Sequence, residues 1–225
     1  MGSNLFPHNI ILNFNPGIDS KTNLEKVVFD SYQKNKDFFG RDDIDIKIKF
    51  LYERTQMDEI CGYKTKNWQV GYANKNKIFI FSPTIFDKVS DHPKSDFEFV
   101  LTHEVAHLFT NEILNFSYPK WLHEGIAGYV AEQYKIRPVE KVDEFVNLHD
   151  KEGWNKFHNY PQAFSFTKYL VDKFGKDKML EFLRNLRINL KNEKSYEEFI
   201  EFFNKFFEAD FDLEVSFCWY TFQVS

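Results

Sequence analysis

A short stretch in the middle of the chain places the strongest constraint on how it can fold. Residues 99–109 read Phe-Val-Leu-Thr-His-Glu-Val-Ala-His-Leu-Phe and contain the pattern His-Glu-x-x-His. Residues four positions apart lie on the same face of a helix, so His103 and His107 can present their imidazoles to one metal ion. Glu104 follows the first histidine and can accept a proton from a water molecule beside that ion. The pattern predicts a helix that carries part of a hydrolytic metal site.

The two histidines require a further ligand, because a catalytic zinc ion normally has three protein ligands. The candidates downstream are Glu112, His123, Glu124 and Glu132. Glu112 follows His107 by five residues, which turns it about 140° away from the histidine face. Glu124 follows His107 by seventeen residues, which leaves room for a turn and a second, antiparallel helix. The spacing favours Glu124, and His123 is its rival.

Small residues follow the favoured ligand along the expected second helix. Gly125, Ala127 and Gly128 come directly after Glu124. Glycine inside a helix costs about 1 kcal/mol relative to alanine, so two glycines here indicate a packing requirement. We expect them to let the two metal-binding helices approach each other closely.

Composition excludes several other kinds of protein. The 225 residues include 27 phenylalanines and are 43% hydrophobic, which predicts a globular core. The net charge of −5 comes without a basic stripe, so we expect no nucleic acid partner. No apolar run approaches the roughly 20 residues that span a bilayer, and we expect no membrane partner. The first residues do not resemble a signal peptide, so a cytoplasmic location is the default expectation. Oligomeric state stays open.

The first ninety residues alternate strand patterns with one helix. The expected helix begins after Asp19 or Ser20 and ends near Phe39, before Gly40. A tight turn at 74–76 has asparagines that tolerate positive φ. The expected strands are residues 9–15, 44–50, 69–73 and 77–81. These elements predict one mixed sheet with a helix on it.

The remainder of the chain has the spacing of helices. A capping box of Ser95 and Glu98 opens the helix that carries the histidines, and a second box of Ser195 and Glu198 opens a later one. Residues 139–159 are expected to form a loop region around one short helix near 140–148. The expected helices cover residues 95–116, 121–134, 161–174, 177–190, 195–207 and 213–222. The predicted fold is α+β, a single domain of residues 1–225 with an α/β part (1–92), a helical part (93–225) and an active-site cleft between them.

The two metal-helix motifs resemble a known family. His-Glu-x-x-His at 103–107 followed by Trp-Leu-x-Glu-Gly-x-Ala at 121–127 is similar to the gluzincins, zinc metallopeptidases of the thermolysin-like superfamily. The similarity is closest to the peptidase MA-like and aminopeptidase N-type catalytic domains. The resemblance implies a zincin fold, a Zn²⁺ ion held by His103, His107 and Glu124, Glu104 as general base, and a peptide or protein substrate.

The resemblance continues more weakly on both sides of the metal motifs. Residues 160–170 resemble the helix that follows the metal helices in those branches, which implies that Tyr160 hydrogen-bonds the oxyanion. His158 could fill the same role. The hairpin of residues 71–80 resembles the edge strand along which an extended peptide lies. The chain has no Gly-x-Met-Glu-Asn segment, with which the aminopeptidase N-type branch holds a free amine, so exopeptidase and endopeptidase action both stay open.

Two other functions are compatible with the sequence. The scaffold could serve as a non-catalytic zincin-like module that binds a peptide or protein, although such a module has no use for Glu104 as a base. It could also be a zinc hydrolase of non-peptide substrates. The remaining histidines His8, His92 and His149 are interpreted as surface residues, and Cys61 and Cys218 as free thiols.

Overall fold

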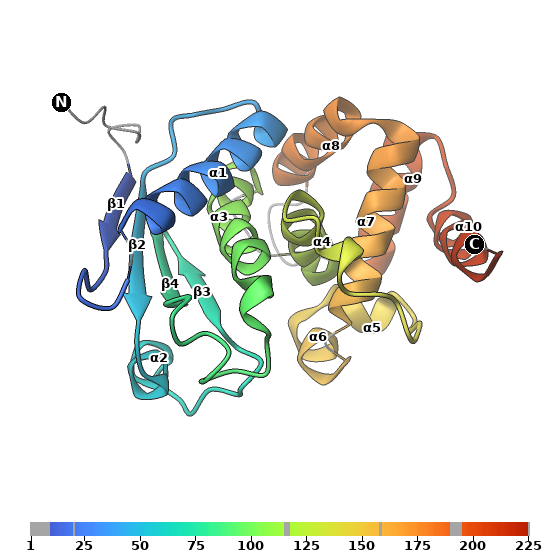
Figure 1. The fold of residues 1–225 in the computed structure, drawn as a ribbon. Coiled ribbons are helices and arrows are strands. Elements are labelled where there is room, and N and C mark those ends of the chain that lie inside the picture. Colours follow the sequence, from blue (N-terminus) through green and yellow to red (C-terminus); the bar gives the residue numbers. More distant parts are fainter. Residues whose placement is uncertain (1–9, 20, 115–117, 158, 190–194, 225) are drawn as a thin grey trace. The chain divides into compact units, whose positions relative to one another are not determined.

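The computed structural model describes residues 10–19, 21–114, 118–157, 159–189 and 195–224. The chain divides into two compact units, residues 1–109 and 110–225 (Figure 1). A small mixed sheet with helices forms the first unit, and the described part of the second unit is helical. The predicted α+β class is confirmed at this level. Within the described ranges, no helix is both long enough and apolar enough to cross a membrane.

A four-stranded sheet is the centre of the first unit among the described residues. Strands β1 (Ile10–Asn13), β2 (Ile46–Leu51) and β4 (Lys77–Phe81) are parallel, and β3 (Gly71–Asn74) pairs antiparallel with β4 at one edge. The predicted mixed sheet is therefore confirmed. In the turn between β3 and β4, the positive φ of 53° falls on Lys75 and not on the flanking asparagines.

Two helices of the first unit lie side by side on one side of the sheet (Figure 1). They are α1 (Lys21–Phe39) and α3 (Phe97–Leu114). The ring of Phe109 on α3 lies 5.6 Å from Tyr32 and 5.4 Å from Phe39 on α1, measured between centroids. Phe97 at the start of α3 contacts Phe50 of β2 at 6.4 Å. The helix of residues 21–39 matches the expectation, and the two histidines lie on a helix as predicted.

The start of α3 differs from the predicted capping box. A 3-10 turn, Lys94–Asp96, precedes the helix, and Pro93 is the extended residue before that turn, with φ −66° and ψ 153°. A capping residue has extended backbone and lies outside the helical turn. Ser95 lies inside the turn, so the expected start at Ser95 is corrected to Phe97.

Helix α2 (Arg54–Cys61) is short, follows β2 and was not predicted from the sequence. A capping box of Glu53 and Gln56 opens it, and Gly62 ends it with φ 75°. The Arg54 guanidinium donates to the carbonyl of Gln69 at 2.6 Å. Helix α2 thereby holds the segment that leads into the edge strand β3.

The second unit is built of helices. Residues 139–159 were expected to contain one short helix, but their described part contains two, α5 (Val146–His149) and α6 (Lys151–Phe157). The expected helix 121–134 ends at Val130 and is followed by the 3-10 turn Gln133–Lys135. The predicted capping box at Ser195 is confirmed. The α-helices are α4 (Lys120–Val130), α5 (Val146–His149), α6 (Lys151–Phe157), α7 (Tyr160–Phe174), α8 (Lys176–Asn189), α9 (Tyr196–Phe207) and α10 (Phe211–Val224).

Aromatic rings form the core of the second unit around Trp121, which is fully buried. Its ring centroid lies 5.1 Å from Phe145, 5.4 Å from Phe166, 5.8 Å from Phe199 and 5.9 Å from Phe211. Large aromatic side chains dominate the energetics of such a core. Helix α4 is therefore anchored at its first turn, one turn before Glu124.

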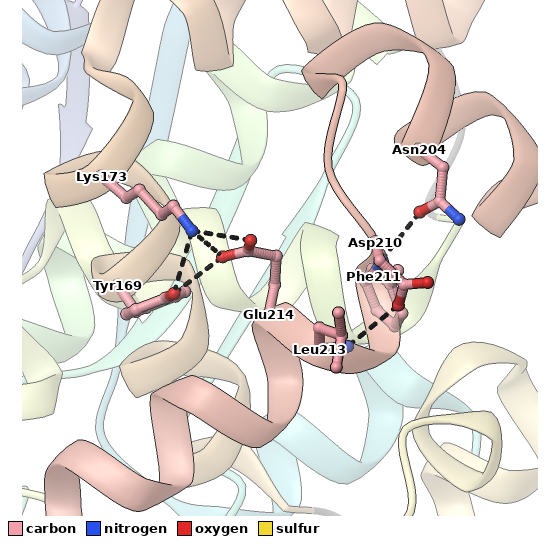
Figure 2. Close-up of polar contacts among 7 residues, drawn as sticks. All are labelled: Tyr169, Lys173, Asn204, Asp210, Phe211, Leu213 and Glu214. Carbon is pink, nitrogen blue, oxygen red and sulfur yellow. Dashed lines mark hydrogen bonds and ion pairs between the residues drawn. The ribbon is translucent and has the colours of Figure 1, made fainter.

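An ion pair with a buried carboxylate holds α10 against α7 (Figure 2). The Glu214 carboxylate accepts hydrogen bonds from the Lys173 ammonium at 2.5 and 2.6 Å and from the Tyr169 hydroxyl at 2.7 Å. The side chain of Glu214 is only 6% exposed. A carboxylate at this depth requires such partners, because an unpaired buried charge is costly.

The expected surface position of His149 is wrong. Its side chain is 2% exposed and is surrounded by aromatic rings. The side chain of His92 is also largely shielded, and its Nδ1 lies 3.4 Å from Asp96. His8 lies outside the described residues. Cys61 and Cys218 form no disulfide, as expected.

Candidate metal centre

Helix α3 presents the His-Glu-x-x-His residues from a well-packed position. His103 and Glu104 are 7% and 8% exposed. The imidazole rings of His103 and His107 lie 4.6 Å apart in an edge-to-face arrangement, which is what the four-residue spacing on a helix produces. The Asn35 side-chain amide on α1 donates to the Thr102 carbonyl at 3.2 Å. This hydrogen bond ties α3 to α1 at the residue directly before His103.

A group that could hold a metal ion consists of the buried residues His103 and Glu124 and the half-buried His107. Each offers one ligand atom, and these atoms all lie within 4.8 Å of one another. Tetrahedral ligands at a zinc–nitrogen distance of about 2.1 Å lie roughly 3.4 Å apart, so the three atoms gather on the scale of a single ion. Two imidazole nitrogens and one carboxylate oxygen are also a ligand set that catalytic zinc uses. The residues present therefore fit a zinc ion.

The rival third ligands have other surroundings. The Nε2 atom of His123 lies 2.9 Å from the Asn111 side-chain oxygen, a hydrogen bond that links α4 to the last turns of α3. Glu132 has left-handed backbone, with φ 57°, and forms an ion pair with Lys135. The group of described residues that could hold a metal ion includes neither of them, nor Glu112.

Lys120 is a charged neighbour of the site that was not predicted from the sequence. Its ammonium lies 3.2 Å from Oε1 of Glu124, one turn later on α4. The Glu124 side chain is 9% exposed, so the ammonium compensates a shielded carboxylate. The four-residue spacing of lysine and glutamate was the available signal.

The glycines after Glu124 serve a different contact from the one expected. A Cβ atom at Gly125 would lie 2.1 Å from Thr167 Oγ1, and one at Gly128 would lie 2.0 Å from a ring carbon of Phe164. Both partners are on α7, so these glycines allow α4 and α7 to approach each other. The expectation that they bring the two metal-binding helices together is corrected. Helix α7 is the neighbour that sets the position of α4 and of Glu124.

Tyr160 is the first residue of α7. The N-cap Asn159 accepts a hydrogen bond from the Gln162 amide at 3.3 Å. The Tyr160 ring packs against Trp154 at 4.8 Å and Phe164 at 5.9 Å, which fixes the ring without assigning a role to its hydroxyl. His158, the alternative, lies outside the described residues. The role of Tyr160 at the oxyanion stays a prediction.

The described residues define an α+β protein with a His-His-Glu group that could hold a metal ion. A family model described as "BSP: Peptidase of plants and bacteria" matches residues 47–211. The match covers most of the chain, from β2 to the start of α10, and the chain belongs to this family. A peptidase family implies a peptide or protein substrate. Searches of curated proteins and of solved structures gave no match.

Proposed function

We propose that the chain is a zinc-dependent metallopeptidase of the gluzincin type. The observation that carries the proposal is the convergence of one ligand atom each from His103, His107 and Glu124 within 4.8 Å. Membership in a peptidase family supports peptide bonds as the target. The His-His-Glu ligand set supports zinc as the ion.

The chain's own residues have distinct roles in this proposal. A bound zinc ion supplies Lewis-acid activation of water and of the scissile carbonyl. Glu104 follows a ligand directly and is 8% exposed. Its carboxylate accepts the proton of the attacking water and delivers it to the leaving amine. The Tyr160 hydroxyl donates a hydrogen bond to the negative charge that develops on the carbonyl oxygen.

A chelation experiment with one substitution tests the proposal. The purified protein should contain about one zinc ion per chain by mass spectrometry, cleave members of a peptide library, and lose this activity to a chelator. Glu104→Gln should keep the zinc and lower kcat about 10²- to 10⁴-fold, because it removes the general base. Glu112→Gln is the matched control on the same helix and should cleave as wild type.

Three results would contradict parts of the proposal. If the wild-type protein binds zinc but shows no peptide cleavage that depends on Glu104, a non-catalytic binding module is favoured. Zinc-dependent hydrolysis of esters but not of peptides would favour a non-peptide substrate. Loss of zinc in His123→Gln but not in Glu124→Gln would show that His123, and not Glu124, is the third ligand.

A further inference from the structure

Strand β3 carries a glycine at the point where the general base approaches it. A Cβ atom at Gly71 would lie 2.5 Å from Oε1 of Glu104 and 2.7 Å from both its Cγ and its carboxyl carbon. Non-bonded heavy atoms are most stable about 3.5 Å or more apart. The volume that any side chain at position 71 would occupy is therefore filled by the side chain of Glu104.

The clash could not be relieved by turning the carboxylate alone. The Cγ atom of Glu104 is as close to the added Cβ as the carboxyl carbon is. Moving Cγ requires rotation about the Cα–Cβ bond, and this swings the whole carboxylate to another direction. A substitution at Gly71 would thus change where the base points.

The strand has little freedom to retreat. Val70, the residue before Gly71, is buried, and its carbonyl accepts a hydrogen bond from the Phe81 amide at 3.3 Å. The carbonyl of Gln69 accepts from the Arg54 guanidinium at 2.6 Å. These contacts fix both the sheet side and the loop side of the segment that leads into β3.

Helix α3 is held equally firmly on the other side of this contact. Leu101, Val105 and Ala106 are fully buried around Glu104. Thr102 donates to the Ser31 hydroxyl at 3.0 Å and accepts the Asn35 amide at its carbonyl. The helix cannot move away from β3 without breaking this packing, so the side chain of Glu104 would have to yield.

We propose that Gly71 is a positioning residue for Glu104, because the absence of its side chain creates the space that holds the general base in place. Glycine inside a strand is unfavourable in itself, and a close approach by another group is one reason for its presence. The assignment of a catalytic role to this contact rests on the proposed function. The contact itself does not.

The test combines Gly71→Ala with Glu104→Ala in a double-mutant cycle. With Glu104 present, Gly71→Ala should lower Tm by a few degrees. With Glu104→Ala, the same change should leave Tm equal or raise it, since alanine suits a strand better than glycine. Gly17→Ala is the matched control, because its Cβ would meet only Asn15 Oδ1 at 3.3 Å. It should behave identically in both backgrounds.

Enzyme kinetics test whether the contact affects catalysis. Gly71→Ala should lower kcat about 100-fold, as expected for a displaced catalytic group, with KM and zinc content unchanged. The proposal is overturned if Gly71→Ala changes Tm equally in both backgrounds, or if kcat is unaffected. If the wild-type protein has no peptidase activity, the proposed function fails, while the Tm cycle still reports whether Gly71 and Glu104 are in contact.

Discussion

His149 should cause the protein to lose stability as the pH falls from 6.5 to 4. The imidazole is 2% exposed, and its centroid lies 4.5 Å from Tyr118, 5.0 Å from Tyr196 and 5.1 Å from Phe199. Neither ring nitrogen has a hydrogen-bond partner within the described part of the chain. Burial lowers the pKa of His149 from 6.5 to about 4, although the negative charge of Asp150 opposes the change.

The direction follows from where the proton binds. The unfolded chain takes up the proton near pH 6.5, and the folded chain takes it up only near pH 4. Between these values the unfolded state holds more protons, so acid favours unfolding. The gap between the two pKa values corresponds to about 3 kcal/mol of unfolding free energy. This loss is absent above pH 6.5 and complete below pH 4.

Urea unfolding of wild type and of His149→Phe between pH 8 and pH 4 measures the effect. Phenylalanine keeps an aromatic ring in place but cannot be protonated. The carboxylates and the other histidines titrate in both proteins and cancel in the difference. The wild type should lose about 3 kcal/mol relative to His149→Phe over this range. Parallel stability curves, or an NMR titration of the His149 ring near pH 6.5, would refute the reasoning.

Two other substitutions test packing in the second unit by thermal unfolding. Gly128→Ala places a methyl group inside the contact with Phe164 and should cost about 1–3 kcal/mol through overpacking; a Tm equal to that of wild type would contradict the close approach of α4 and α7. Lys173→Met leaves the buried carboxylate of Glu214 without its cation and should cost about 1–3 kcal/mol, discounted because the lysine side chain is 40% exposed. The exposed ion pair of Lys168 and Asp172 offers the control. Lys168→Met should change Tm by less than about 2 °C.

The helical spacing of the metal motif was readable from sequence because it depends on local geometry. Residues four apart share a helix face regardless of the rest of the fold, so His103 and His107 could be paired at once. The strands and most long helices were predicted for the same reason, since their periodicity is written in consecutive residues. For the third ligand, the sequence favoured Glu124 over His123 without excluding His123. The two residues are adjacent, so their spacing from His107 hardly distinguishes them.

Elements with weak local signals were missed or misplaced. Helix α2 has eight residues and one buried side chain, Met57, so it carries almost no apolar periodicity. The region of α5 and α6 was reduced to one helix because both are short. A single glycine such as Gly62 marks an end but does not reveal what precedes it.

The sequence by itself determined the chemistry available to this protein: a helix with two histidines and a glutamate, a second helix with Glu124 as the favoured third ligand, and a mixed sheet ahead of them. Tertiary structure decided what each small or buried residue is for. Gly125 and Gly128 face α7, His149 lies among aromatic rings, and Gly71 makes room for Glu104. These roles depend on contacts between residues distant in the chain, and such contacts leave no periodic trace in the sequence.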